Sequence, residues 1–325
     1  MKERILNIET VHQCNCCLGC KTLHPLVSVI DLSKSNLEQQ IIKFDFYTIL
    51  MMEGEIDDIL YGRKYYDYSN ASLVFLTPGE SIKINKSKAL PSKGWLLAFH
   101  PDLISQTSLG EHIKDYSFFF YNPEEALHLS QREKAKAVEC ICNIEEELRH
   151  AIDCHSQILI SRYIELLLDH CNRFYERQFI TRCEANKKIM KKTDVLLKDY
   201  ILSGKLKYNT SPSLGYCAKI LQLSSHYFND LLKFESGKNI DEYFESKRLE
   251  MAKKLGATHT INGSQEDVVE RVKEITNGEM LDFVQDCAGA VPLADIAMNS
   301  IKKTGAYYIT GLFHAPVPMN LGKVV

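Results

Sequence analysis

The chain has 325 residues, of which 45% are hydrophobic and 25% charged, and its formal net charge is −3. This length accommodates two or three domains with separate cores, and the composition is that of an ordinary globular protein. A chain with this net charge does not attract nucleic acid through its overall charge. A local basic surface that binds nucleic acid is not excluded. No apolar run approaches the roughly 18 residues of a membrane span. The N-terminus also lacks the apolar core of a signal peptide, so we expect a cytoplasmic protein with no membrane partner.

The N-terminal segment, residues 1–24, is rich in cysteine. Cys14, Cys16, Cys17 and Cys20 all fall within the sequence CNCCLGC. Cysteines in a reducing compartment are mostly free thiols, and the Cys-x-x-Cys spacings resemble those of zinc or copper(I) ligands. Four ligands in one short loop close a tetrahedral site with difficulty, and no second Cys or His pair follows nearby. We therefore expect an exposed, oxidation-prone segment, with a metal or thiol-sensing site as the alternative.

Residues 25–129 are predicted to form a β domain. Short runs rich in β-branched and aromatic residues, separated by Gly and Pro, are typical of a β-sandwich or barrel. His100, which follows the last run, is expected to cap a loop rather than to contact a ligand. The predicted strands lie within LVSVIDLS, FDFYTILMM, ILYGRKYYDY, SLVFLTPGE, SIKIN and GWLLAFHP.

Residues 130–181 are predicted to form a helical hairpin. Apolar side chains recur with a helical period from Gln131 to His150 and again from about Ser156 to Arg177. The second helix is apolar over more than one face. Core packing and a dimer interface both explain this pattern, and a homodimer through the 130–180 helices is the expected assembly.

Residues 182–254 begin with a locally basic stretch and are then predicted to contain a helix-turn-helix. Ser213 and Ser224 stand at N-cap positions, and Gly237 stands where the second helix ends. In such a unit the polar face of the second helix enters the major groove, where Asn pairs with adenine and Lys reaches guanine or phosphate. The pattern alone leaves an ordinary helical hairpin equally open.

The segment CAKILQLSSHYFNDLLKFESGKNIDEYFESKRLEMAKK resembles the first helix-turn-helix and the start of the linker helix of AraC-family transcription regulators. Upstream, KTLHPLVSVID, FDFYTI, GWLLAFHPDLI and RFYERQFITR resemble the cupin-like sensor domain and helical linker of one bacterial branch of that family. The resemblance covers about residues 20–254. It implies a sensor domain for a small-molecule effector, a dimerising linker and a reader of promoter DNA half-sites. The DNA-binding residues that it implies are Ser225, His226, Asn229, Asp230 and Lys233.

Residues 255–325 change in character, because no second helix-turn-helix follows. Instead THTI, EDVVERVKEIT, LDFVQDCAG, LADIAMNSIKK and AYYITGLF alternate strand-like and helix-like patterns, which indicates βα units and a parallel sheet. Over about residues 248–323, RLEMAKKLGATHTIN and DFVQDCAGA resemble part of the cofactor domain of medium-chain, zinc-type alcohol dehydrogenases. In the strand order 3-2-1-4-5-6 this tail supplies strands 3, 4 and 5 and leaves two unpaired edges.

The expected fold is α+β and multidomain: a cupin-like β-sandwich or barrel, a helical hairpin, a helix-turn-helix and a partial Rossmann-like α/β fragment. The expected function is an AraC-type transcription regulator, impaired by the loss of its second helix-turn-helix and not an enzyme. No catalytic residue, cofactor or metal ligand is assigned. One alternative is an NAD(P)-dependent alcohol-dehydrogenase-like protein, disfavoured because the glycine-rich turn and zinc ligands are absent. The other is a nonfunctional fusion product.

Overall fold

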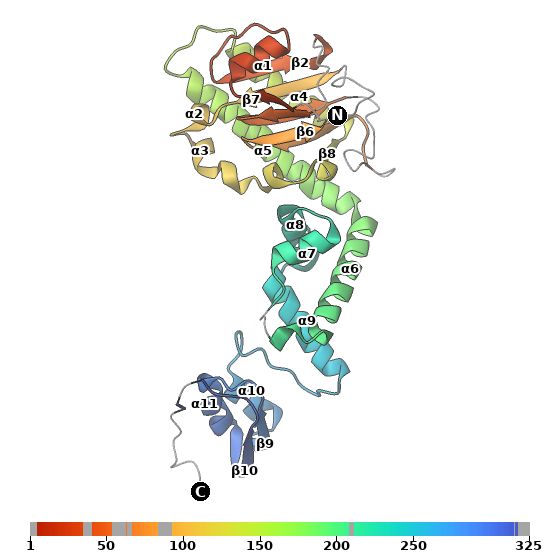
Figure 1. Cartoon of the computed structure of the whole chain (residues 1–325), viewed down its shortest axis with the longest axis vertical. Coiled ribbons are helices and arrows are strands. Elements are labelled where there is room, and N and C mark those ends of the chain that lie inside the picture. The colour runs from red at the N-terminus through yellow and green to blue at the C-terminus, as the bar shows by residue number, and fades with distance from the viewer. Residues whose placement is uncertain are drawn as a thin grey trace. The chain divides into compact units, whose positions relative to one another are not determined.

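The computed structural model describes residues 5–34, 41–53, 63, 67–83, 93–207, 211–314 and 316–317. The chain divides into two compact units, Met1–Phe244 and Glu245–Val325, both drawn in Figure 1. The division falls earlier than the boundary at residue 254 expected from the sequence, and the finer division into five segments stays a prediction. None of the helices in these ranges combines the length and apolarity that a bilayer crossing requires.

In its described residues, the first unit contains two β-sheets. The larger has the order β2-β7-β4-β5-β8 with antiparallel neighbours, and the smaller has the order β1-β3-β6, in which β1 and β3 run parallel. The predicted runs that fall in the described ranges are confirmed as strands, whereas ILYGRKYYDY lies largely outside them. The bounds are β1 (Ile5–Ile8), β2 (Val27–Asp31), β3 (Ile41–Phe44), β4 (Tyr47–Met52), β5 (Ala71–Leu76), β6 (Glu80–Lys83), β7 (Gly94–Phe99) and β8 (Leu127–Leu129).

Two hydrophobic cores lie on opposite sides of the larger sheet. Along β4, Ile49 and Met51 belong to one core, whereas Leu50 and Met52 belong to the other. Successive side chains of a strand point to opposite faces, so the continuous apolar run of β4 is that of a strand buried on both sides. The larger sheet is therefore the central layer of this unit.

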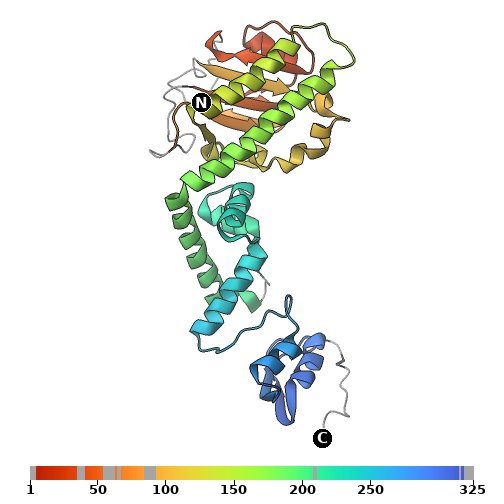
Figure 2. The same cartoon turned by 180° about the vertical axis from the view of Figure 1, so that it is seen from behind.

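The helices α4 (Gln131–Glu147) and α5 (Ser156–Thr181) cover the first core and lie side by side across the sheet in Figure 2. Both predicted helices are confirmed. Ser130 begins α4 with a capping box, in which its hydroxyl and the Glu133 carboxylate each accept a backbone N–H. Exposed apolar side chains remain on α5, and a homodimer through these helices stays a prediction. These side chains are Ile158, Leu159, Leu166 and Ile180.

Short helical segments connect β7 to β8. His100 caps the first of them, since its Nδ1 accepts the Asp102 backbone N–H at 3.2 Å, which confirms its predicted structural role. The short segments of this unit are η1 (Leu32–Lys34), α2 (Pro101–Ile104), α3 (Ser108–His112), η2 (Ile113–Asp115), η3 (Ser117–Phe120) and η4 (Pro123–Glu125).

The cysteine-rich segment folds as β1 and the helix α1 (Val11–Cys17), which packs against the second core. Cys14 is completely buried, whereas Cys16 and Cys17 are exposed. The prediction of an exposed segment is therefore wrong for Cys14, because the helical period turns its side chain inward with that of Leu18. Across the described ranges, no group of three His, Cys, Asp or Glu side chains could hold a metal ion.

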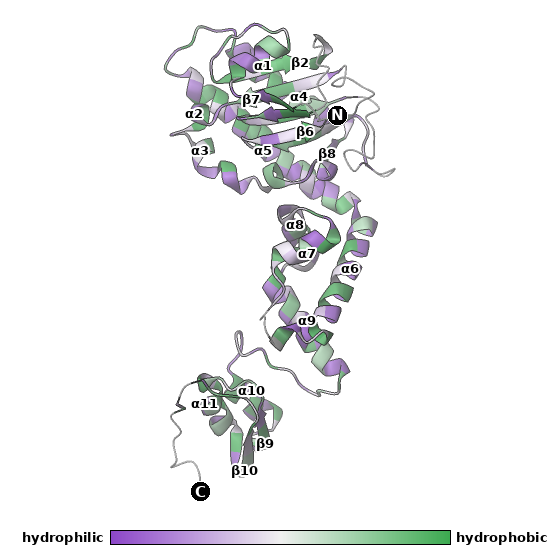
Figure 3. Cartoon of the chain, viewed as in Figure 1, coloured by the Kyte–Doolittle hydropathy of each residue, from purple (hydrophilic) through white to green (hydrophobic). Residues whose placement is uncertain are grey.

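The remaining helices of this unit are α6 (Cys183–Leu202), η5 (Lys205–Lys207), α7 (Leu214–Leu221) and α8 (Ser225–Ser236), whereas α9 (Ile240–Lys254) begins in this unit and continues past its end at Phe244. Hydrophilic and hydrophobic residues alternate along α6 in Figure 3, as expected of an amphipathic helix with one buried stripe. The predicted caps are confirmed: the hydroxyls of Ser213 and Ser224 accept first-turn N–H groups, and Gly237 ends α8 with a φ of 68°. That left-handed conformation favours glycine.

The second unit contains α10 (Val268–Ile275), β9 (Leu281–Asp286), α11 (Val291–Ser300) and β10 (Ile301–Ile309). The two strands pair in parallel, as expected of βα units. The predicted strand THTI is wrong, since residues 259–261 form no regular element. In the expected strand order its hydrogen-bonding neighbour would be strand 2, which this segment does not supply, and an unpaired strand is not stable.

Candidate functional site

The polar face of α8 contacts the β-rich part of the same unit. The Tyr121 hydroxyl donates to the Asp230 carboxylate at 2.7 Å, and the rings of Phe120 and His226 stack with centroids 4.7 Å apart. Asn229 donates to Asp230 at 3.4 Å. Two of the five predicted DNA-binding side chains, Asp230 and His226, therefore contact other residues of the unit.

The N-terminal end of α8 is also occupied. The backbone N–H and the hydroxyl of Ser224 donate to the two oxygens of the Glu125 carboxylate at 2.8 and 2.5 Å. Burial raises the pKa of Glu125, although the hydrogen bonds from Ser224 oppose this shift. Of the other predicted DNA-binding residues, Ser225 is half-buried and Lys233 is exposed.

A second candidate site lies at the carboxyl ends of β9 and β10. Open parallel sheets bind ligands beyond these ends. The carboxylate of Asp286, the last residue of β9, accepts the backbone N–H groups of Ala288 and Gly289 at 2.8 and 2.9 Å, and the hydroxyl of Tyr307 at 3.1 Å. These hydrogen bonds, the one from Gly289 above all, lower the pKa of Asp286. An ionised carboxylate thus fixes the loop that follows β9.

The loops after β9 and β10 approach each other closely. Gly289 has a φ of +66°, and a Cβ on Gly311 would lie 2.2 Å from the Gly289 backbone nitrogen. A side chain at either position cannot be accommodated without a shift of the backbone. The backbone N–H groups of Thr310 and Gly311 also donate to the Asp286 carbonyl oxygen. The loops after β9 and β10 are therefore in direct backbone contact, and no side chain protrudes at Gly289 or Gly311.

The sheet of the second unit has an uncovered apolar surface. Phe283 and Tyr308 are 53% and 55% exposed, and their ring centroids lie 4.7 Å apart. Among the described residues, β9 and β10 pair only with each other. A sheet with two open edges and exposed aromatic rings is typical of a part of a larger fold.

Residues 244–325 match the zinc-binding dehydrogenase family. A sorbitol dehydrogenase of Halalkalibacterium halodurans is 37% identical over 79 residues, 24% of this chain and 23% of the relative. A sorbitol dehydrogenase of Bacillus subtilis is 37% identical over 89 residues, 27% and 25% of the two chains. A D-arabitol-phosphate dehydrogenase of Enterococcus avium is 41% identical over 69 residues, 21% and 20% of the two chains. No solved structure matches the chain.

The chain thus spans about a quarter of the length of the curated relatives it matches. These matches confirm the dehydrogenase resemblance of the C-terminal segment, whereas no finding supports the resemblance to AraC-family regulators. The prediction of a DNA-binding transcription regulator that is not an enzyme is wrong, because the matched family and these relatives are dehydrogenases. The dehydrogenase-like alternative is favoured instead.

The family description implies a zinc ion, but the residues that the structure describes do not fit one. Among the described residues, no three His, Cys, Asp or Glu side chains gather as metal ligands. A dinucleotide fits in part. At the edge near Asp286, Gly289 and Gly311 carry no side chains that would obstruct a ligand. The Asp286 carboxylate, however, already accepts the backbone N–H groups of Ala288 and Gly289. A phosphate would find neither a glycine-rich turn nor free loop amides here, and the carboxylate would repel it.

The importance of Asp286, Gly289 and Gly311 was not predicted from the sequence. The two glycines form no glycine-rich dinucleotide turn, so that motif does not single them out. A usable signal was nevertheless present, since the predicted strand run LDFVQDCAG contains Asp286 and Gly289 and the run AYYITGLF contains Gly311. The carboxyl ends of parallel strands meet at one edge, so this pattern places the three residues together.

Proposed function

We propose that the chain is a dehydrogenase-like protein whose residues 245–325 form part of a nicotinamide-dinucleotide-binding domain. The match of residues 244–325 to the zinc-binding dehydrogenases carries the proposal. The parallel pairing of β9 and β10 supports it. In the strand order of such domains these strands correspond to strands 4 and 5, and strand 4 borders the switch point at which a dinucleotide lies.

The proposed reaction is the oxidation of a hydroxyl-bearing carbon of a polyol or polyol phosphate, by analogy with the sorbitol and arabitol-phosphate dehydrogenases. A bound nicotinamide supplies the acceptor for the hydride. In this chain Asp286 fixes the loop after β9 by accepting the backbone N–H groups of Ala288 and Gly289. The negative charge of Asp286 disfavours phosphate at this edge and is compatible with the cationic, oxidised nicotinamide ring and with ribose. No metal-dependent step is assigned to this chain.

Titration of the full chain with NADH, followed by cofactor fluorescence, tests the proposal. We expect saturable binding, and Asp286→Asn weakens it by about tenfold because charge-assisted hydrogen bonds to the loop are lost. Asp282→Asn is the matched control: Asp282 lies at the other end of β9, and its carboxylate is exposed although it pairs with the half-buried Lys302. A folded chain that shows no saturable NADH binding, and no NADH formation from NAD⁺ and sorbitol, would overturn the proposal.

A further inference from the structure

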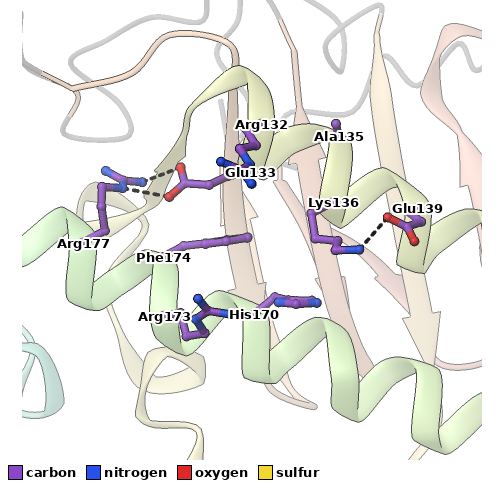
Figure 4. A pocket seen from close by; sticks show the side chains of 9 residues that line it. All are labelled: Arg132, Glu133, Ala135, Lys136, Glu139, His170, Arg173, Phe174 and Arg177. Atoms are coloured by element: carbon purple, nitrogen blue, oxygen red, sulfur yellow. Dashed lines mark hydrogen bonds and ion pairs between the residues drawn. The ribbon is translucent and has the colours of Figure 1, made fainter.

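A groove with a volume of about 700 Å³ lies between α4 and α5 in the first unit. This volume is typical of sites for small molecules. The first turns of α4 contribute one wall and the C-terminal half of α5 contributes the other. Figure 4 shows the groove, which is lined by Arg132, Glu133, Ala135, Lys136, Glu139, His170, Arg173, Phe174 and Arg177.

The lining carries excess positive charge. Two of its cations are neutralised: Arg177 forms two hydrogen bonds with the Glu133 carboxylate at 2.9 Å, and Lys136 pairs with Glu139 at 2.8 Å. Arg132 and Arg173 are exposed and, among the residues that the structure describes, form no ion pair or hydrogen bond. With His170 neutral, two positive charges therefore remain, one on each wall of the groove.

A buried donor in the same groove also has no partner. Arg177 donates through Nε and Nη2, and its guanidinium lies over the Tyr68 ring at 4.9 Å. Its Nη1 is buried and has no hydrogen-bond acceptor within the described part of the chain. An unsatisfied buried donor costs about 1–3 kcal/mol, but a ligand in the open groove does not reach a buried atom, which leaves Arg132 and Arg173 as the donors for an oxyanion.

An aromatic surface lies among these cations. Phe174 projects from α5 towards α4, between the Arg177–Glu133 and Lys136–Glu139 pairs in Figure 4. The ring of His170 is nearly parallel to that of Phe174, with an interplanar angle of 10° and centroids 6.0 Å apart. A planar ring can stack on Phe174 while oxyanion oxygens reach the flanking guanidinium groups.

We propose that this groove binds a planar aromatic oxyanion, with its ring against Phe174 and its phosphate or carboxylate held by Arg132 and Arg173. The two guanidinium groups provide forked donors for either oxyanion, and Phe174 discriminates against inorganic anions. Nothing in this site depends on the second unit, so the proposal is independent of the dehydrogenase function.

Fluorescence titration of the full chain with 1-naphthyl phosphate tests the site, with 1-naphthoate, neutral 1-naphthol and inorganic phosphate as comparison probes. We expect saturable submillimolar binding of the naphthyl phosphate or the naphthoate, and at least tenfold weaker binding of naphthol and of inorganic phosphate. The stronger of the two aromatic anions identifies which oxyanion the site prefers. Arg132→Gln and Arg173→Gln each weaken binding of that anion by about tenfold, and the double variant abolishes it.

Arg162→Gln is the matched control, because Arg162 is also exposed on α5 but does not line the groove. All three arginines are exposed, so these variants retain the fold, which circular dichroism verifies. Phe174→Leu weakens binding of the aromatic anion but leaves that of inorganic phosphate unchanged. Absence of binding of both aromatic anions to the folded chain refutes the proposal. Equal binding by the wild type and the Arg132→Gln/Arg173→Gln double variant refutes it as well.

Discussion

The buried ion pair between Arg182 and Asp67 offers a quantitative test of how the first unit is held together. Two guanidinium nitrogens of Arg182 donate to the two Asp67 oxygens at 2.9 and 2.7 Å, and the side chains are only 9% and 0% exposed. Burial alone lowers the pKa of Arg182, yet its hydrogen bond and charge interaction with Asp67 raise it overall. The pair joins the end of α5 to a residue distant in sequence.

Substitution Arg182→Met removes the guanidinium group that forms two hydrogen bonds with the buried Asp67 carboxylate. Breaking such a pair from one side destabilises a protein by about 3–5 kcal/mol, whereas replacing both members with apolar residues is often nearly neutral. We therefore expect Arg182→Met to lower the free energy of unfolding by about 3–5 kcal/mol, and the Arg182→Met/Asp67→Leu double variant to recover most of this loss. The Asp67→Leu single variant completes the thermodynamic cycle, and we expect the double variant to lose much less stability than the sum of the two single losses.

Urea titration followed by Trp95 fluorescence measures these effects. Trp95 is the single tryptophan of the chain and lies in β7, so its signal reports the first unit alone. Arg162→Gln, an exposed arginine substitution on α5, is the control and should change the free energy of unfolding by less than about 0.5 kcal/mol. A loss below about 1 kcal/mol for Arg182→Met, or a double variant no more stable than the single one, would refute the reasoning.

Three further predictions concern other buried groups. Because burial raises the pKa of Glu125 above its ordinary 4.5, its contribution to stability is complete below pH 4.5 and is lost as the pH rises through the folded value. Urea titrations should therefore show the wild type gaining stability relative to Glu125→Gln between pH 7 and 4.5. Gly311→Ala should accelerate amide exchange in β9 and β10 and leave the Trp95 transition unchanged, since its Cβ would clash with the Gly289 backbone. Burial raises the pKa of Cys14 to about 12, so peptide mass spectrometry should find Cys16 and Cys17 alkylated at pH 8 and Cys14 protected until the chain unfolds.

Features governed by neighbouring residues could be predicted from the sequence. The caps at Ser213 and Ser224 and the glycine at the end of α8 were predicted correctly, because capping involves residues within one helical turn. The doubly buried run of β4 is also visible as continuous apolar sequence. Such local patterns determine where elements begin and end, but not which elements meet.

Features governed by distant residues could not be predicted. The segment THTI has the composition of a strand but lacks a neighbour to pair with, and the inward turn of Cys14 depends on packing against the second core. The contacts of Asp230 with Tyr121 and of Ser224 with Glu125 join residues about a hundred positions apart. The functional prediction failed for a related reason: the pattern of α7 and α8 indicates two capped helices and does not identify their role.

Amide hydrogen exchange of the full chain, with and without NADH, tests the central claim most directly. If residues 245–325 form part of a dinucleotide-binding domain, NADH should slow exchange in the peptides that contain Asp286 to Ala290 and Ile309 to Leu312. Exchange in β4 and β7 should stay unchanged, since these strands lie in the first unit. Unchanged exchange at both of these loops with saturating NADH, or protection confined to the first unit, would contradict the account.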